Sequence, residues 1–313
     1  MPQFDITIAG ELNLDLILYG LPEQLAPERE LLADRMMLTL GSSSAIVAHN
    51  LAALGSKVGF QSRIGEDPLG AIALERLQQG GVDTSQVRRM PGAITTGLTV
   101  ILHHQNWRNI LTYAGTITEL TWDDLDLDYL ADARHFHLSS YYLHRALRPK
   151  IVELFQRLKS KGLTISLDTN DDPDDRWEGN LKQVLEYVDV FLPNEREACK
   201  AAGTEDVEAA IRKLSEAVPL LVVKMGRKGA IAQRGNERFT SAAKVVEPVD
   251  TVGAGDSFDA GFLHQYVRGA DIEACLTSAN LAGALSTTRP GGTEAFRDVA
   301  HRQNFLANAD VKG

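Results

Sequence analysis

The sequence has few cysteines and no segment suited to a membrane. Only two cysteines occur in 313 residues, Cys199 and Cys275, and neither belongs to a Cys-x-x-Cys pair. Such sparse thiols are typical of proteins from reducing compartments. No apolar run is long enough to span a membrane, and the N-terminal residues lack the basic and apolar regions of a secretion signal. We therefore expect a cytoplasmic protein without disulfides or membrane contact.

Positive charge is also scarce. The chain has 42 acidic and 32 basic residues, which gives a formal net charge of −10. Nucleic-acid binding usually needs a basic face, so we expect no nucleic-acid partner. The sequence shows no short repeat, low-complexity tract or linker that would divide it. We therefore expect one domain over residues 1–313, long enough to bury a large core.

Two common nucleotide-binding motifs are absent. There is no Walker A string of the form Gly-x-x-x-x-Gly-Lys-Ser/Thr. Gly253 and Gly255 begin like a dinucleotide fingerprint, but Phe258 stands where its third glycine should be, and the motif lies late in the chain. A dinucleotide-dependent oxidoreductase is therefore disfavoured.

What the sequence does contain is the string DTVGAGDSFDAGF at residues 250–262. Two glycines precede a helical pattern, and backbone amides at the positive end of a helix bind anions, most often phosphate. Asp256 lies at this position, where a carboxylate can take a proton from an attacking hydroxyl. This combination is what phosphoryl transfer to an alcohol needs. The alternative for these few residues is a tight turn with a helix-capping aspartate.

Strand and helix patterns alternate along most of the chain, which predicts an α/β fold. A β-branched, alternating segment at 95–103, a polar turn at 104–108 and a second segment at 109–113 instead predict a hairpin. A hairpin that interrupts α/β alternation does not fit a parallel sheet. The remaining expected strands cover residues 4–9, 135–138, 163–167, 188–192 and 219–225, and the expected helices cover 41–55, 147–161 and 274–286.

The string at 250–262 closely resembles the C-terminal signature of the ribokinase-like (PfkB) carbohydrate kinases. The similarity extends from the first strand to the loop at 289–292. It implies a three-layer α/β fold with a mostly parallel sheet, helices on both faces, and a small β lid from approximately residues 11–40 and 94–116. It also implies ATP-dependent phosphorylation of a sugar hydroxyl with Mg²⁺. The base would be Asp256, and the anion hole would consist of the amides of Gly253, Ala254 and Gly255.

On the sugar side, the resemblance implies hydroxyl contacts at Asn13 and Asp15, which follow the first strand. The family's N-terminal signature is altered here. Gly41 is retained, but Ser42 replaces the second glycine and Ile46 stands where an asparagine is expected. Sugar contacts therefore cannot simply be transferred to this segment. Ser42 either offers a hydroxyl to the sugar or caps the following helix.

On the nucleotide side, the resemblance implies that Asn194 and Glu197 organise Mg²⁺ and the phosphates, largely through water. A helix start enriched in acids is the alternative reading of that pair. The acid-rich loop at 168–175 is read as a turn, with Asp168 and Asn170 nearest the active cleft. The resemblance also allows a monovalent cation such as K⁺ beside Asp250 and Val252. The ATP contacts it implies are Asn194, Lys224, Gly226, Gly229, Thr251 and Asn280.

The sugar-side segments 11–18, 41–50 and 95–103 contain no Lys or Arg. Arg108 lies on the expected hairpin turn, and we expect it to point to solvent. This predicts a neutral sugar, with fructose first and ribose next, while histidines leave a sugar acid open. A nucleoside kinase of the same superfamily and a non-catalytic sugar- or nucleotide-binding protein are the alternatives. A homodimer through the lid is also expected.

Overall fold

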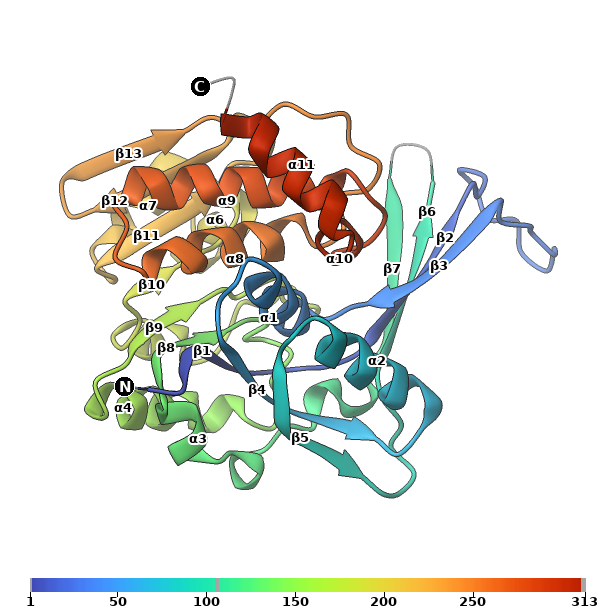
Figure 1. The fold of residues 1–313 in the computed structure, drawn as a ribbon, viewed down its shortest axis with the longest axis horizontal. Coiled ribbons are helices and arrows are strands. Elements are labelled where there is room, and N and C mark those ends of the chain that lie inside the picture. The colour runs from blue at the N-terminus through green and yellow to red at the C-terminus, as the bar shows by residue number, and fades with distance from the viewer. Residues whose placement is uncertain (1, 105–106, 311–313) are drawn as a thin grey trace.

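A computed structural model describes residues 2–104 and 107–310. Within them, nine strands form one sheet in the order β13-β12-β11-β10-β9-β8-β1-β4-β5 (Figure 1). The strands from β5 to β11 pair in parallel, and β12 and β13 continue the sheet antiparallel. These strands are β1 (Phe4–Ala9), β4 (Val58–Gly65), β5 (Asp83–Met90), β8 (Ala133–Leu138), β9 (Thr164–Leu167), β10 (Val190–Phe191), β11 (Leu220–Lys224), β12 (Ala230–Arg234) and β13 (Glu237–Ser241).

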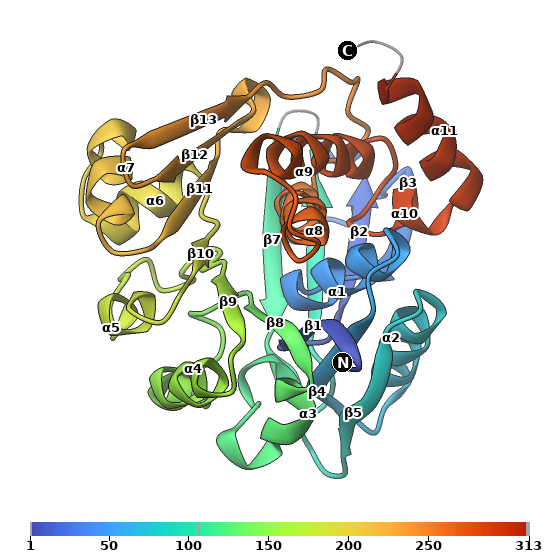
Figure 2. The same ribbon diagram turned by 60° about the vertical axis from the view of Figure 1, so that its left-hand side comes forward.

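Helices cover both faces of this sheet (Figure 2). One face carries α1 (Ser43–Ala53), α2 (Pro68–Gln79), α8 (Ala254–Tyr266) and α9 (Ile272–Thr287), and the other carries α3 (Leu127–Ala131), α4 (Ile151–Ser160), α5 (Leu181–Leu185), α6 (Glu195–Ala202) and α7 (Val207–Ser215). Two further helices, α10 (Glu294–Arg297) and α11 (Val299–Asp310), pack against α9. Within the described residues, no helix is long and apolar enough to cross a membrane.

The side-chain pattern explains these layers. Strand β11 reads LLVVK, and its four apolar residues are buried, as expected for a strand covered on both faces. Helix α4 turns one apolar stripe, formed by Ile151, Leu154, Phe155 and Leu158, toward the sheet. Leu221 and Val223 belong to the core of one face, whereas Leu220 and Val222 belong to the core of the other. A separate hydrophobic core therefore lies on each face of the sheet.

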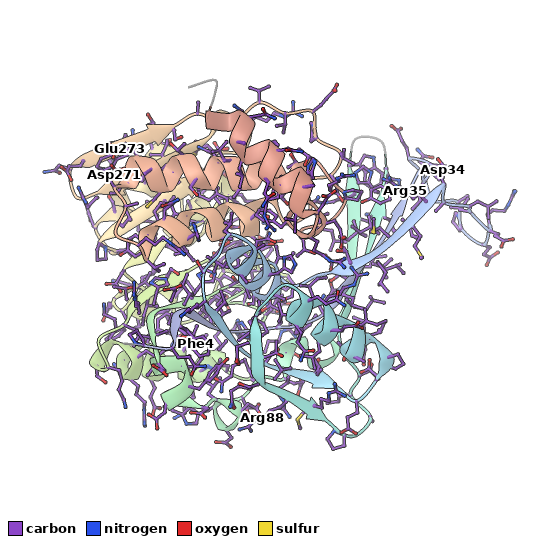
Figure 3. The ribbon with its side chains drawn as sticks, in the orientation of Figure 1. Phe4, Asp34, Arg35, Arg88, Asp271 and Glu273 are labelled. Carbon is purple, nitrogen blue, oxygen red and sulfur yellow. The ribbon has the colours of Figure 1, made fainter. Side chains whose placement is uncertain are left out.

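Four strands form a second, smaller sheet that projects from the main body (Figure 1). They are β2 (Leu14–Tyr19), β3 (Arg35–Leu40), β6 (Leu98–His103) and β7 (Arg108–Tyr113), in the order β3-β2-β6-β7. Ile17 is opposite Ile101, which is opposite Ile110, so the three side chains share one face. That face packs against Val252, immediately before α8. Asp34 and Arg35 lie at the far end of this sheet (Figure 3).

The predicted α/β fold and its small β sheet are confirmed. The hairpin strands form as expected, although the ladder begins at Leu98, and residues 105–106 of the predicted turn lie outside the described residues. The helix after the glycine motif begins at Ala254, with Gly253 in a left-handed conformation as its cap. Gly255 and Asp256 are therefore inside its first turn. Whether the chain acts as a single domain, with the small sheet as its lid, stays a prediction.

Candidate active site

The first turn of α8 offers free backbone donors. Gly253 has φ of 71°, and a Cβ there would lie 2.5 Å from the Cα of Gly292, so only glycine is accommodated. Among the described residues, the amides of Gly253, Gly255 and Asp256 have no hydrogen-bond acceptor, and that of Ala254 makes a long 3.3 Å bond to the Thr251 carbonyl. Together with the positive end of α8, these amides form a seat for an anion.

Asp256 lies within this turn and is only 8% exposed. Burial and the nearby charge of Asp168 raise its pKa to about 6, although Lys224 and a hydrogen bond from Ser43 act in the opposite direction. The amide Nδ2 of Asn170 lies 3.5 Å from its Oδ1. A carboxylate with a pKa near neutrality is suited to take a proton from a hydroxyl.

The structure brings the predicted sugar-side residues together. The amide of Gly41 donates to the Asn13 carbonyl at 3.0 Å. A Cβ on Gly41 would lie 2.2 Å from Oδ1 of Asp15 and 2.9 Å from Nδ2 of Asn13, so a side chain there would displace both polar groups. Burial and the charges of Asp256 and Asp250 raise the pKa of Asp15 to about 7. Asp15 and Asp256 therefore lie close enough to repel each other.

The altered segment at 41–46 has a structural explanation. The hydroxyl of Ser42 accepts from the amide of Ala45 at 3.1 Å and donates to the Glu11 carbonyl at 2.5 Å, so the side chain caps α1. Ile46 packs against the backbone of Gly253 and Gly292. The asparagine expected at this position is thus replaced by an apolar contact. A sugar contact through the Ser42 hydroxyl stays a prediction, and it would have to replace one of these bonds.

Asn194 and Glu197 form a capping box at the start of α6. The amide of Glu197 donates to Oδ1 of Asn194 at 2.9 Å, and the backbone amide of Asn194 donates to Oε2 of Glu197 at 2.8 Å. Nδ2 of Asn194 also donates to Oε1 of Glu197 at 2.5 Å. Burial and the charge of Asp168 raise the pKa of Glu197 to about 7. An ionised carboxylate has about four acceptor positions, so two remain for the waters of a Mg²⁺ ion, and the pair fits that role.

Two of the remaining ATP-side residues, Gly229 and Asn280, meet at the end of β13. Gly229 has φ of 98°, and a Cβ there would lie 2.0 Å from the carbonyl of Ser241, so the close approach requires glycine. Asn280 on α9 donates to the same carbonyl at 3.1 Å. Gly226 has φ of 57° and opens the short 3₁₀ turn Gly226–Lys228. Direct contacts of these residues with ATP stay predictions.

Lys224 lies at the end of β11, and its predicted contact with ATP stays a prediction. Its ammonium lies in a buried cluster, 2.6 Å from Oδ2 of Asp168 and 3.2 Å from both oxygens of Asp259. The sequence indicated Asp168 near the cleft but gave Asp259 no role. The available signal was spacing, because Asp259 follows Asp256 by three residues and so shares its face of α8.

Arg108 is exposed at the start of β7, as expected, but it also contacts the loop before α8. Its Nη1 donates to Oγ1 of Thr251 at 3.1 Å. Its charge also acts to lower the pKa of Asp15. The register pairs Arg108 with His103, on the same sheet face as Asp15. The sugar-side segments contain no Lys or Arg, but this exposed arginine on an adjoining strand supplies a cation on their side of the small sheet.

Asp250 connects the loop before α8 to the small sheet through a hydrogen bond with Tyr19 of β2. Its Oδ2 accepts from the Tyr19 hydroxyl at 2.8 Å and from the Gly291 amide at 3.2 Å, and its Oδ1 accepts from the Val252 amide at 3.0 Å. The side chain is buried, and within the described chain no basic side chain forms an ion pair with it. A buried carboxylate with neutral donors only is compatible with a nearby monovalent cation. Across the described residues, no group of three or more His, Cys, Asp or Glu is arranged to hold a metal ion.

Comparison with known proteins agrees with this geometry. The pfkB family carbohydrate kinase model matches residues 3–298. The chain belongs to this family. It is 30% identical to a cytidine kinase of Thermococcus kodakarensis and to a fructokinase of Salmonella typhimurium, each match covering 87% of this chain and 92% of the relative. A structure described as a ribokinase II of E. coli, in complex with ATP and Mg²⁺, is 25% identical with a TM-score of 0.84, covering 97% of this chain and 99% of that one.

Proposed function

We propose that this kinase transfers the γ-phosphoryl group of ATP to a hydroxyl of a small sugar, with Asp256 as general base. The observation that carries the proposal is the first turn of α8, where a buried carboxylate adjoins unpaired backbone amides and faces Asp15. A protein that only binds sugar or nucleotide has no need of a base beside an anion seat. Catalysis is therefore the better reading of this turn.

In the proposed step, the sugar oxygen attacks the γ-phosphorus and forms a new P–O bond. The bond from that phosphorus to the bridging oxygen breaks, and its electron pair leaves with ADP. The hydroxyl proton passes to the carboxylate of Asp256, while the amides of Gly253 and Gly255 hold the non-bridging oxygens. When bound, Mg²⁺ neutralises phosphate charge, and its waters would be held by Asn194 and Glu197.

The acceptor is bound by Asn13 and Asp15, whose oxygens and amide suit the hydroxyls of a polyol. Arg108 adds one positive charge beside them, so a sugar acid competes with fructose and ribose as acceptor. A nucleoside remains the alternative, since the relatives at equal identity include both kinds of kinase. The Trp107 ring does not favour a nucleobase, because it stacks on His104 with centroids 3.9 Å apart.

An ATP-coupled assay over fructose, ribose, 2-keto-3-deoxy sugar acids, nucleosides and fructose 6-phosphate tests the acceptor class. A free sugar or sugar acid should be phosphorylated fastest, and Arg108→Gln should slow only the acids. Asp256→Asn should lower turnover by about two to four decades with ATP binding kept. The surface variant Asp128→Asn should be unchanged. Faster reaction of a nucleoside or of fructose 6-phosphate would refute the sugar assignment.

We also propose that two copies pair through the small sheet. Its outer face, opposite Asp15, carries adjacent apolar side chains, and several are strongly exposed, including Met36 at 62% and Leu111 at 55%. An apolar sheet face of this kind is typical of an interaction surface. Other apolar residues on this outer face include Leu16, Leu18, Leu38, Val100 and Leu102. We place the enzyme in the cytoplasm, where its two free cysteines stay reduced.

A further inference from the structure

Three charged side chains from three elements meet behind the anion seat. Lys224 ends β11, Asp168 follows β9, and Asp259 lies in α8. Only 10% of the Lys224 side chain is exposed, against 1% for Asp168 and 0% for Asp259. Burying three ionisable groups is costly, and a well-packed apolar cluster is often equally stable. Fold stability alone is therefore a weak reason for this arrangement.

The position of the ammonium relates the cluster to the anion seat. A Cβ on Gly255 would lie 3.7 Å from Nζ of Lys224, so the ammonium lies beside the backbone of the first turn of α8. The same charge acts to lower the pKa of Asp256, which shows that it reaches the base as well. A lysine at this point adds a full positive charge where the backbone supplies only partial ones.

The ammonium donates to three carboxyl oxygens, and the two bonds to Asp259 are the longer ones, so a phosphoryl oxygen would replace one of these two. Lysine has three N–H donors, and among the described residues the acceptors of Nζ all belong to Asp168 and Asp259. Burial acts to raise the pKa of Asp168, but the Lys224 charge and a hydrogen bond from Asp259 hold it below its ordinary value. Burial raises the pKa of Asp259 well above its ordinary value, although Lys224 acts against this. Lys224 therefore favours the charged form of Asp168, whereas burial disfavours a charge on Asp259.

We propose that the Lys224 ammonium binds the phosphoryl group during its transfer, and that Asp168 and Asp259 are positioning residues that aim it. This inference rests on the proposed kinase function; the family resemblance implied only a general ATP contact for Lys224 and gave the two acids no part in it. In the step, Lys224 keeps its protons and stabilises the negative charge of the phosphoryl oxygens. Preorganised charge of this kind acts without reorganisation at the moment of reaction.

The first experiment compares equilibrium binding of Mg²⁺-AMP-PCP and Mg²⁺-ADP, because only the former has a γ-phosphate. Lys224→Met should weaken AMP-PCP at least tenfold more than ADP, and should lower kcat about 100-fold. Lys161→Met, at an exposed surface lysine, is the matched control and should change neither. An unchanged ratio of the two affinities would show that Lys224 does not contact the γ-phosphate. This readout needs no acceptor, so it decides the inference even if no sugar on the panel reacts.

The second experiment is a double-mutant cycle in kcat. Asp259→Asn keeps the shape of the side chain and an oxygen that can accept from Lys224, so it should fold and lower kcat only a few-fold, whereas Asp168→Asn should lower it about tenfold with acceptor KM unchanged. If both acids act through the ammonium, each change should have almost no further effect in the Lys224→Met background. Multiplicative effects would show that the acids act independently and would overturn the positioning role. Thermal unfolding of every variant identifies any folding defect, and Lys224→Arg should restore part of the lost AMP-PCP affinity.

Discussion

We expect the carboxyl group of Asp15 to destabilise the folded enzyme near neutral pH when no ligand is bound. Its carboxyl is 6% exposed and has a pKa of about 7, against an ordinary value of 3.8, because of burial and the charges of Asp256 and Asp250. A carboxyl whose pKa is higher in the folded chain binds more protons when folded, so stability falls as pH rises from about 4 to about 7. Between pH 5 and pH 7 this amounts to about 2 kcal/mol, because each fully bound proton contributes about 1.4 kcal/mol per pH unit and the folded carboxyl is half ionised at pH 7.

The variant Asp15→Asn removes this term because its side chain is neutral at every pH. We compare the free energies of unfolding of the variant and the wild type, measured in urea without ligands. Their difference should change in favour of the variant by about 2–3 kcal/mol from pH 5 to pH 8. Asp256 titrates in both proteins, so its contribution largely cancels. At the same time the KM for the acceptor should rise about tenfold, because a charged hydrogen-bond acceptor is lost. ATP binding should be unchanged.

The same measurement on Asp128→Asn, whose side chain is 92% exposed, provides the control. Its unfolding free energy should differ from that of the wild type by a small amount that is constant with pH. If Asp15→Asn also gave a pH-independent difference, the buried acid would not be titrating near neutrality, and the argument would fail. A joint loss of ATP and acceptor affinity would instead indicate a misfolded site.

Three other results are expected. The pH profile of kcat/KM should rise through about pH 6, the pKa of Asp256, because the base acts only when ionised; a flat profile from pH 5 to pH 8 would contradict this. Glu197→Gln should raise the Mg²⁺ concentration for half-maximal rate with acceptor KM unchanged, whereas an unchanged Mg²⁺ curve would leave Asn194 and Glu197 as a helix cap only. Leu111→Asp should convert a sedimenting dimer to monomer, but Val245→Asp, at a more exposed apolar residue outside the small sheet, should not; a monomeric wild type would refute the pairing.

The fold was predictable because its signals are local. Strand β11 is a continuous apolar run, and α4 repeats its apolar residues at helical spacing. The secondary structure and burial of each segment can therefore be predicted from its own residues. Helix boundaries were less predictable. The start of α8 depends on the conformation of Gly253, which is set by the approach of Gly292 from 39 residues away in the sequence. The residues next to Gly253 in the sequence give no indication of this long-range contact.

Some residues of the candidate site could likewise be predicted from local sequence, whereas others depend on long-range contacts. Asp256, Asn13 and Asp15 were found because each belongs to a motif or follows a strand. Lys224 was found as a loop lysine, but its partners Asp168 and Asp259 come from elements 56 and 35 residues away. The hydrogen bond of Arg108 depends on strand register and on Thr251, which lies 143 residues further along. Side-chain direction at such positions is decided by tertiary contacts, which no local pattern encodes.

These long-range contacts also connect the two halves of the site. The small sheet contacts the loop before α8 through the Tyr19–Asp250 hydrogen bond, the Arg108–Thr251 hydrogen bond and the packing of Val252. The next residue, Gly253, begins the anion seat. Any shift of the small sheet must therefore change contacts within three residues of the amides for which we propose phosphoryl binding. If the proposed function is correct, this short loop is the physical route by which acceptor binding would position the phosphoryl group and exclude water.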